Sequence, residues 1–178
     1  MNHAVIRRIL GLILLFESAF LLLPCMVAVI YREKQGLSYL AVAFICLVIG
    51  FLLTRRKNEN QMFYAKEGFV IVALSWIVMS FFGAMPYYLS GDIPDVSQAL
   101  FEAVSGFTTT GASTLSSVEV LSHCTLVWRA FTIWIGGMGV IVFLLAVLPL
   151  TGGYNMHLMR AESPGPSVGK LVPKVRET

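Results

Sequence analysis

Four long apolar blocks constrain the fold of this 178-residue chain more than any other feature of its sequence. Together they contain only two charged residues, Glu17 and Arg129. A helix of about 20 mostly apolar residues is long enough to cross the hydrocarbon core of a bilayer. The sequence therefore predicts an all-α membrane protein with four transmembrane helices, at about residues 9–31, 37–53, 69–89 and 127–150.

The composition agrees with a membrane environment. Hydrophobic residues make up 57% of the sequence and charged residues 13%, whereas soluble domains average roughly half and a quarter. A formal net charge of +3 is too small to indicate a nucleic-acid partner. Three scattered cysteines without C-x-x-C spacing predict neither a metal site nor a disulfide. No nucleophile–base pair stands out, so the sequence does not favour an enzyme.

The distribution of positive charge predicts the orientation. The N-terminus, residues 55–66 and the tail hold ten of the thirteen Lys and Arg residues, while residues 90–127 hold none. Because cytoplasmic loops are enriched in Lys and Arg, both termini and the middle loop are expected in the cytoplasm. The segment 90–127, which carries four acidic residues, is expected outside. Arg32 and Lys34, between the first two blocks, are exceptions to this rule.

The segment between the third and fourth blocks predicts a half-helix. Asp95 is a candidate N-cap for a helix over residues 96–105. About ten residues are half of what a membrane crossing needs, yet the run is too apolar for an exposed loop. A short helix that dips into the membrane and returns satisfies both facts, because non-helical backbone at that depth must be buried or line a watery cavity.

Residues 105–112, Ser-Gly-Phe-Thr-Thr-Thr-Gly-Ala, follow this half-helix and predict an ion-selectivity filter. Thr108, Thr109 and Thr110 offer successive carbonyl and hydroxyl oxygens, which can replace the hydration shell of potassium. Gly106 and Gly111 permit the positive-φ conformations that turn carbonyls toward an axis. A simple turn or a phosphate-binding loop is the alternative, but the order of spanning helix, capped half-helix, Thr/Gly row and spanning helix favours the filter.

Several other residues carry hypotheses with open alternatives. Glu102 and Arg129 are expected to form an ion pair that braces the filter from behind, or else to lie independently at the water interface. Glu17 is expected to meet a polar partner in the helix bundle, with a functional charge as the alternative. The Gly-Gly-Met-Gly run at residues 136–139 is interpreted as a close-packing surface, with a hinge as the alternative.

Residues 101–114 resemble the first pore loop of the Trk/Ktr potassium-uptake family, closest to its TrkH-type subunits. The resemblance extends to residues 136–139 in the next helix, to Tyr31 and Arg32, and to residues 160–166 in the tail. It covers practically the whole chain, including the two helices that TrkH-type members carry before their first pore module.

The resemblance implies a function in potassium uptake. Family members fold four helix/pore-helix/helix modules around one pore, and each module contributes one filter strand. Thr109 and Thr110, together with Thr108, match positions expected to contact K⁺, and Gly111 matches the filter glycine. The transported ion is K⁺, with no other metal expected. The implied setting is the bacterial inner membrane, with a cytoplasmic TrkA-type nucleotide-binding regulatory subunit as partner.

One filter loop cannot surround an ion, which predicts that this chain works as part of something larger. The expected division is a leading pair of helices and loop (1–66), a pore module (67–152) with its filter at 105–112, and a cytoplasmic tail (153–178) that begins a further module. The chain is expected to be a fragment, a truncated product or a module needing missing pore modules or further copies. A self-assembling channel subunit and a non-conducting membrane scaffold remain alternatives.

Overall fold

The computed structural model describes the backbone of residues 3–55 and 65–151, and the side chains of residues 3–55 and 68–139. Within these residues the chain is all-α, as predicted, and no strand is present. Its elements are α1 (His3–Tyr31), α2 (Gly36–Thr54), α3 (Ala65–Ser90), α4 (Val96–Phe107) and α5 (His123–Thr151). The predicted tail, 153–178, lies outside the described residues.

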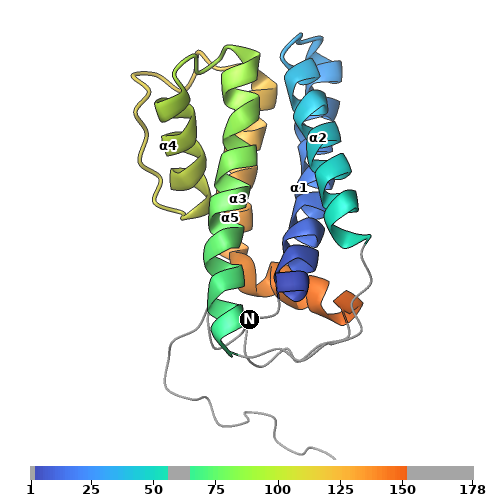
Figure 1. The fold of residues 1–178 in the computed structure, drawn as a ribbon. Helices are drawn as coiled ribbons and strands as arrows, with labels where there is room; N and C mark the ends of the chain where they lie inside the picture. The colour runs from blue at the N-terminus through green and yellow to red at the C-terminus, as the bar shows by residue number, and fades with distance from the viewer. Residues whose placement is uncertain (1–2, 56–64, 152–178) are drawn as a thin grey trace, which may run out of the picture.

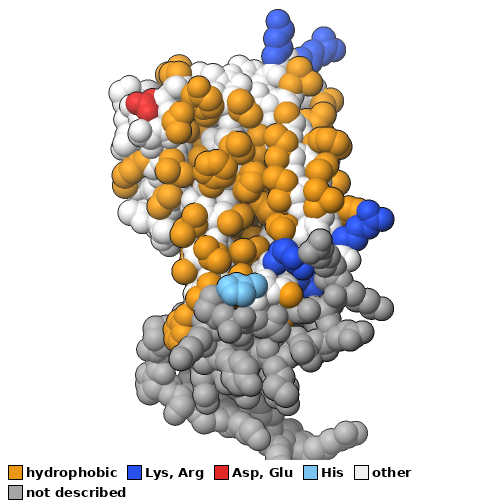
Figure 2. Space-filling view, viewed as in Figure 1, with side chains coloured by type: hydrophobic (Ala, Val, Ile, Leu, Met, Phe, Trp, Pro, Cys, Tyr) orange, Lys and Arg blue, Asp and Glu red, His pale blue; other side chains and the backbone are white. Residues whose placement is uncertain are grey.

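Three helices within the described residues are long and apolar enough to cross a membrane. They are His3–Tyr31, Gly36–Thr54 and Gly68–Ser90, which correspond to the first three apolar blocks. Apolar side chains cover most of the length of the bundle, while Lys and Arg side chains gather toward its two ends (Figure 2). This distribution fits a bundle whose middle lies in lipid.

α5 fills the fourth predicted block but is not straight. Gly139 has φ 73° and ψ 151°, which is non-helical backbone inside the helix. The helix turns aside at this residue and its last part runs across the lower end of the bundle (Figure 1). The straight part, 123–138, is about 24 Å long at 1.5 Å per residue. The run at residues 136–139 therefore contains a bend at Gly139, the position where the hinge alternative would act.

α4 and the segment after it enter and leave at the same end of the bundle. The connection from α3 lies at the upper end in Figure 1, α4 descends beside α3, and the following segment climbs back to the start of α5. Asp95 caps α4 as predicted, because its carboxylate accepts a hydrogen bond of 2.7 Å from the Ser97 amide. The path is the one expected of a re-entrant half-helix.

The leading helices α1 and α2 form a closely packed pair. A Cβ added to Gly11 would lie 2.9 Å from the Gly50 carbonyl oxygen, and one added to Gly50 would lie 2.7 Å from that of Gly11. The Ser18 hydroxyl donates to the Ala43 carbonyl at 2.7 Å. Small residues and a buried hydroxyl thus let the two backbones approach, as in other membrane helix pairs.

Glu33, in the turn between α1 and α2, fastens this pair to the start of α5. Its carboxylate accepts hydrogen bonds from the amides of His123 (2.8 Å) and Cys124 (3.0 Å) and contacts the His123 ring nitrogen at 2.8 Å. Partial burial alone would raise the pKa of Glu33, but the bonds from Cys124 and His123 outweigh it and lower the pKa to about 2. A carboxylate at a helix N-terminus is also favoured by the helix dipole.

Asp92 provides a second carboxylate at the same helix end. Its Oδ2 accepts hydrogen bonds from the Ser122 hydroxyl and, at 2.5 Å, from the Thr125 hydroxyl. The Tyr39 hydroxyl of α2 lies 2.9 Å from that of Thr125. The N-terminal end of α5 is therefore tied both to α2 and to the connection between α3 and α4.

Glu17 differs from its sequence expectation. It lies buried in α1, but neither carboxyl oxygen has a hydrogen-bond partner among the residues whose side chains are described. Its Oε1 lies opposite Gly83 of α3, 3.5 Å from where a Cβ would stand. The expected polar partner is thus not found within the described part of the bundle.

Replacing Glu33 by Gln is expected to destabilise the chain by about 1–2 kcal/mol at neutral pH, because an N-terminal carboxylate and its hydrogen bonds are weakened. Since folding lowers the pKa of Glu33 from 4.5 to about 2, this contribution is present above pH 4.5 and is lost as the pH falls toward 2.

Thermal unfolding of the two purified chains at pH 7, 4.5 and 3 measures the difference. The difference in unfolding temperature between the original chain and the Glu33→Gln variant should shrink as the pH falls. A gap that is constant or grows on acidification would contradict the assignment. Glu119→Gln, at an exposed position in the loop before α5, is the matched control.

Candidate ion-coordinating site

The backbone after α4 folds back onto the last turn of that helix. The amides of Thr108, Thr109 and Thr110 donate to the carbonyls of Val104 (2.9 Å), Gly106 (2.9 Å) and Ser105 (3.0 Å). The Gly111 amide also points to the Ser105 carbonyl, at 3.5 Å. These bonds satisfy carbonyls that a helix C-terminus leaves unpaired.

The carbonyl oxygens of the same residues are left without protein donors. Among the described residues, no N–H or O–H group donates to the carbonyls of Thr109, Thr110 or Gly111. All three residues are exposed in this chain. The loop therefore has its donors turned to the protein and its acceptors available to a ligand. Such an arrangement suits a cation and disfavours an anion.

Two residues of the loop adopt left-handed backbone. Gly111 has φ 73°, as the sequence predicts for the second filter glycine, and Thr109 has φ 56°. A β-branched residue in this region is an outlier, and such strain concentrates at functional sites. Gly106 does not have positive φ and lies inside α4, so the predicted conformational role for this glycine is wrong.

The hydroxyl groups of Thr108 and Thr110 are engaged within the loop. The Thr108 hydroxyl donates to the Val104 carbonyl at 2.8 Å and lies 2.8 Å from the Thr110 hydroxyl. No hydrogen bond of the Thr109 hydroxyl is present among the described residues. The main-chain oxygens of Thr109, Thr110 and Gly111 therefore remain available as ligands, together with the hydroxyl lone pairs that accept no hydrogen bond.

Glu102 and Arg129 form the ion pair expected from the sequence. Nε of Arg129 lies 3.0 Å from Oε2 of Glu102, whose side chain is 1% exposed. The other carboxylate oxygen accepts from the Ser113 hydroxyl (2.6 Å) and the Thr114 amide (2.8 Å). One buried carboxylate thus joins α4, α5 and the segment that leaves the loop.

Ser105 makes a second link across the loop. Its hydroxyl donates to the Ala112 carbonyl at 2.6 Å, while its own carbonyl receives the Thr110 amide. Nothing in the sequence pattern singles out Ser105 or Ser113 as loop supports. Only their positions, on the inner face of α4 and just beyond the Thr/Gly row, connect them with the loop.

Two glycines let α5 pack directly against the end of α4. A Cβ on Gly136 would collide with the Phe107 carbonyl oxygen, and a Cβ on Gly106 would collide with the Thr132 hydroxyl. The packing interpretation of residues 136–139 therefore holds at Gly136. It places α5 directly behind the residue that precedes the threonine row.

Phe107 anchors the loop in the core between α3 and α5. Its ring would contact a Cβ on Gly83 at 2.7 Å, and it lies edge-on to Trp128 with ring centroids 6.4 Å apart. The indole N–H of Trp128 donates to the Gly83 carbonyl at 2.9 Å. Phe107 and Trp128 are both fully buried, so the loop rests on a rigid base.

The site offers no alternative built from side chains. Among the described residues, no group of three or more His, Cys, Asp and Glu side chains could hold a metal ion.

Comparison with known proteins places these features in a family. Residues 37–178 match the TrkH family model, described as a cation transport protein. The whole chain is 40% identical over 183 aligned residues to the Trk system potassium uptake protein TrkH of Escherichia coli K12. It is 38% identical, over 89% of its length, to an uncharacterised cation transporter of Methanocaldococcus jannaschii.

The fold agrees with a solved relative. The crystal structure of the potassium transporter TrkH from Vibrio parahaemolyticus matches 90% of this chain with a TM-score of 0.74 and 33% sequence identity. The chain spans 38% of the length of the E. coli protein and 36% of the crystallised one. These relatives are transporters rather than enzymes. The chain belongs to the TrkH family of cation transport proteins.

Proposed function

We propose that this chain supplies one strand of the selectivity filter of a Trk-type potassium-uptake system. The observation that carries the proposal is the loop geometry at residues 108–111, where amides are bonded to α4 and carbonyl oxygens are left to a ligand. The E. coli relative is a potassium uptake protein and the crystallised relative a potassium transporter, which supports potassium as the transported ion.

In this mechanism, oxygens take the place of water around a dehydrated ion. The carbonyls of Thr108, Thr109, Thr110 and Gly111 contribute one side of the cage, and K⁺ is the substrate rather than a bound cofactor. The C-terminal end of α4 adds partial negative charge near the ion. No covalent chemistry is involved, and conduction needs only that binding be favourable but weak enough for release.

The filter loop works together with other filter loops, since one loop covers only one side of an ion. The remaining filter strands come from polypeptide outside these 178 residues or from further copies of the chain. The division into leading helices (1–66), pore module (67–152) and tail (153–178) belongs to this proposal. So does the location in the bacterial inner membrane, with both termini in the cytoplasm and a TrkA-type nucleotide-binding subunit on the inner face.

Replacing Gly111 by Ala is expected to lower rubidium uptake, which reports potassium transport, about tenfold in cells that carry the complete assembly. Gly111 has φ 73°, and a side chain in that conformation costs roughly 1–2 kcal/mol of backbone strain. In the variant, the filter backbone relieves this strain by moving its carbonyl groups. Discrimination of rubidium against sodium should fall together with the uptake.

Gly91→Ala is the matched control. Gly91 also has positive φ, at 80°, and has open space around it, but it lies in the connection between α3 and α4. This variant should transport normally. Equal losses in the two variants, at equal protein levels, would show that backbone strain alone causes the effect and would count against the filter.

A double-mutant cycle tests the support by Glu102 and Arg129. Glu102→Gln is expected to destabilise the chain by about 3 kcal/mol because it removes one partner of a buried pair. Arg129→Gln should cost about as much, because the bonds from Ser113 and Thr114 only partly compensate a fully buried carboxylate that has lost its cation. The double variant should lose less than the sum of the two, by about 1 kcal/mol or more.

Thermal unfolding and rubidium uptake are measured on the same four proteins. Strict additivity in both readouts would mean that the two groups act independently. The bracing proposal would then be wrong.

A further inference from the structure

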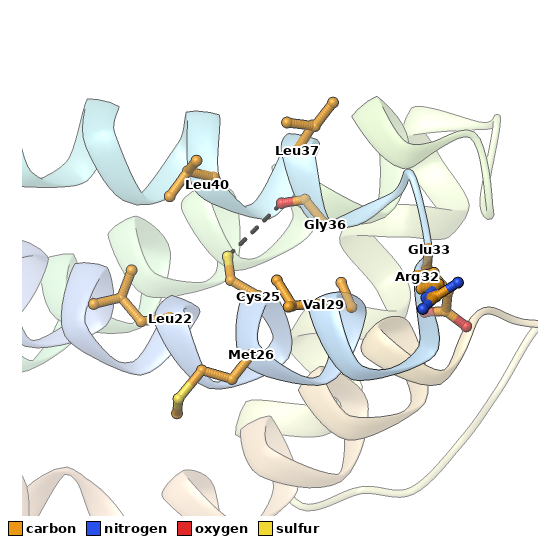
Figure 3. Close-up of a pocket in the computed structure, with 10 residues that line it drawn as sticks. Leu22, Cys25, Met26, Val29, Arg32, Glu33, Gly36, Leu37 and Leu40 are labelled. Carbon is orange, nitrogen blue, oxygen red and sulfur yellow. Dashed lines mark hydrogen bonds between the residues drawn. The ribbon is translucent and has the colours of Figure 1, made fainter.

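A furrow with apolar walls runs between α1 and α2, next to the turn that joins them (Figure 3). Its volume is about 540 Å³. A second hollow of about 500 Å³ continues it along the same helix pair, and the two share three lining residues. The walls of the joined furrow come mainly from Leu22, Met26, Val29, Leu37, Leu40 and Leu47.

The furrow has the length of one bilayer leaflet. From Leu37, at the turn, to Leu47, at the far end of the second hollow, α2 rises about 15 Å at 1.5 Å per residue. The hydrocarbon core of a bilayer is about 30 Å thick. A furrow that starts at the membrane surface and ends near the middle of the bilayer matches one acyl chain.

The mouth of the furrow is positively charged. Arg32 lines it, and Lys34 lies two residues further along the turn; both are exposed. Neither has an ion pair among the described residues. The carboxylate of Glu33, between them, is occupied by the amides of His123 and Cys124. Two cations at the membrane surface are therefore left for an external anion.

Arg32 occupies a position that normally belongs to glycine. α1 ends in a Schellman motif, in which the Glu33 amide donates to the Ala28 carbonyl at 2.8 Å and Arg32 adopts φ 57°. Glycine is the usual residue at this left-handed position. An arginine held there at the expense of backbone strain indicates a use for its side chain.

We propose that this furrow binds an anionic phospholipid, with one acyl chain between α1 and α2 and the phosphate at Arg32 and Lys34. A flexible chain fits an irregular furrow, and the cations complement the headgroup. The proposal also explains why Arg32 and Lys34 lie at the same end of the bundle as the segment 90–127, which has no Lys or Arg.

Native mass spectrometry of the full, purified chain tests the proposal by titration with phosphatidylglycerol and, separately, phosphatidylcholine. One phosphatidylglycerol should bind at least about tenfold more tightly than phosphatidylcholine, because two surface cations contribute. Inorganic phosphate should not displace it, since the acyl chain supplies part of the binding.

Arg32→Gly is the decisive variant. Glycine suits the left-handed position, so this change should keep or raise the unfolding temperature while weakening phosphatidylglycerol binding about fivefold. Arg32→Gly with Lys34→Gln should remove the preference for phosphatidylglycerol altogether. Leu40→Trp, at a half-exposed wall position, should block the furrow with both cations intact.

Arg55→Gln is the matched control, because Arg55 is an exposed cation at the other end of α2. It should leave the affinity within twofold of the original chain. Equal binding of the two lipids, equal loss in the Arg55 variant or displacement by phosphate would each overturn the proposal. So would a dimer of the chain that excludes lipid and is lost in Leu40→Trp.

Discussion

The candidate site depends on how the backbone leaves α4. The amides of Thr109 and Thr110 bond to carbonyls of the last helical turn, so the peptide groups of the loop cannot turn their donors outward. Their carbonyl oxygens are the groups left over, and a polar group without a partner is costly unless water or a ligand satisfies it. Two left-handed residues, Thr109 and Gly111, allow this reversal within a few residues. The proposed cation ligand is therefore argued from the backbone rather than from any side-chain charge.

The surrounding helices keep this arrangement rigid. α5 contacts the end of α4 through Gly136, and the Glu102–Arg129 pair ties the returning segment to both helices. Glu33 and Asp92 then fix the N-terminal end of α5, Glu33 from the turn between α1 and α2 and Asp92 from the connection between α3 and α4. Helices α1 and α2 thereby support α5 without contributing to the loop itself. Preorganised oxygens of this kind need little rearrangement when an ion arrives.

Much of this could be predicted from the sequence, for identifiable reasons. Long apolar blocks predict where the long helices lie, although α1 and α5 begin several residues earlier than their blocks. The short run after Asp95 predicts the half-helix, because length and capping are local properties. The Glu102–Arg129 pair was predictable because buried charges in lipid need partners. The bend at Gly139, the left-handed Thr109 and the helical Gly106 were not, since each depends on which backbone groups meet across helices. The supporting roles of Ser105 and Ser113 could not be predicted because short polar residues are common in such segments.

The most direct test weakens one carbonyl oxygen without changing any side chain. Replacing Ala112 by lactic acid in the complete assembly turns the Gly111–Ala112 amide into an ester, whose carbonyl is a poorer ligand; the Ala112 amide makes no hydrogen bond among the described residues. A matched ester at Ser116–Ser117 lies in the same segment, outside the loop. Rubidium uptake and its selectivity over sodium should fall for the first ester and stay unchanged for the second. Uptake that is indifferent to the Gly111 ester would contradict coordination by main-chain oxygens.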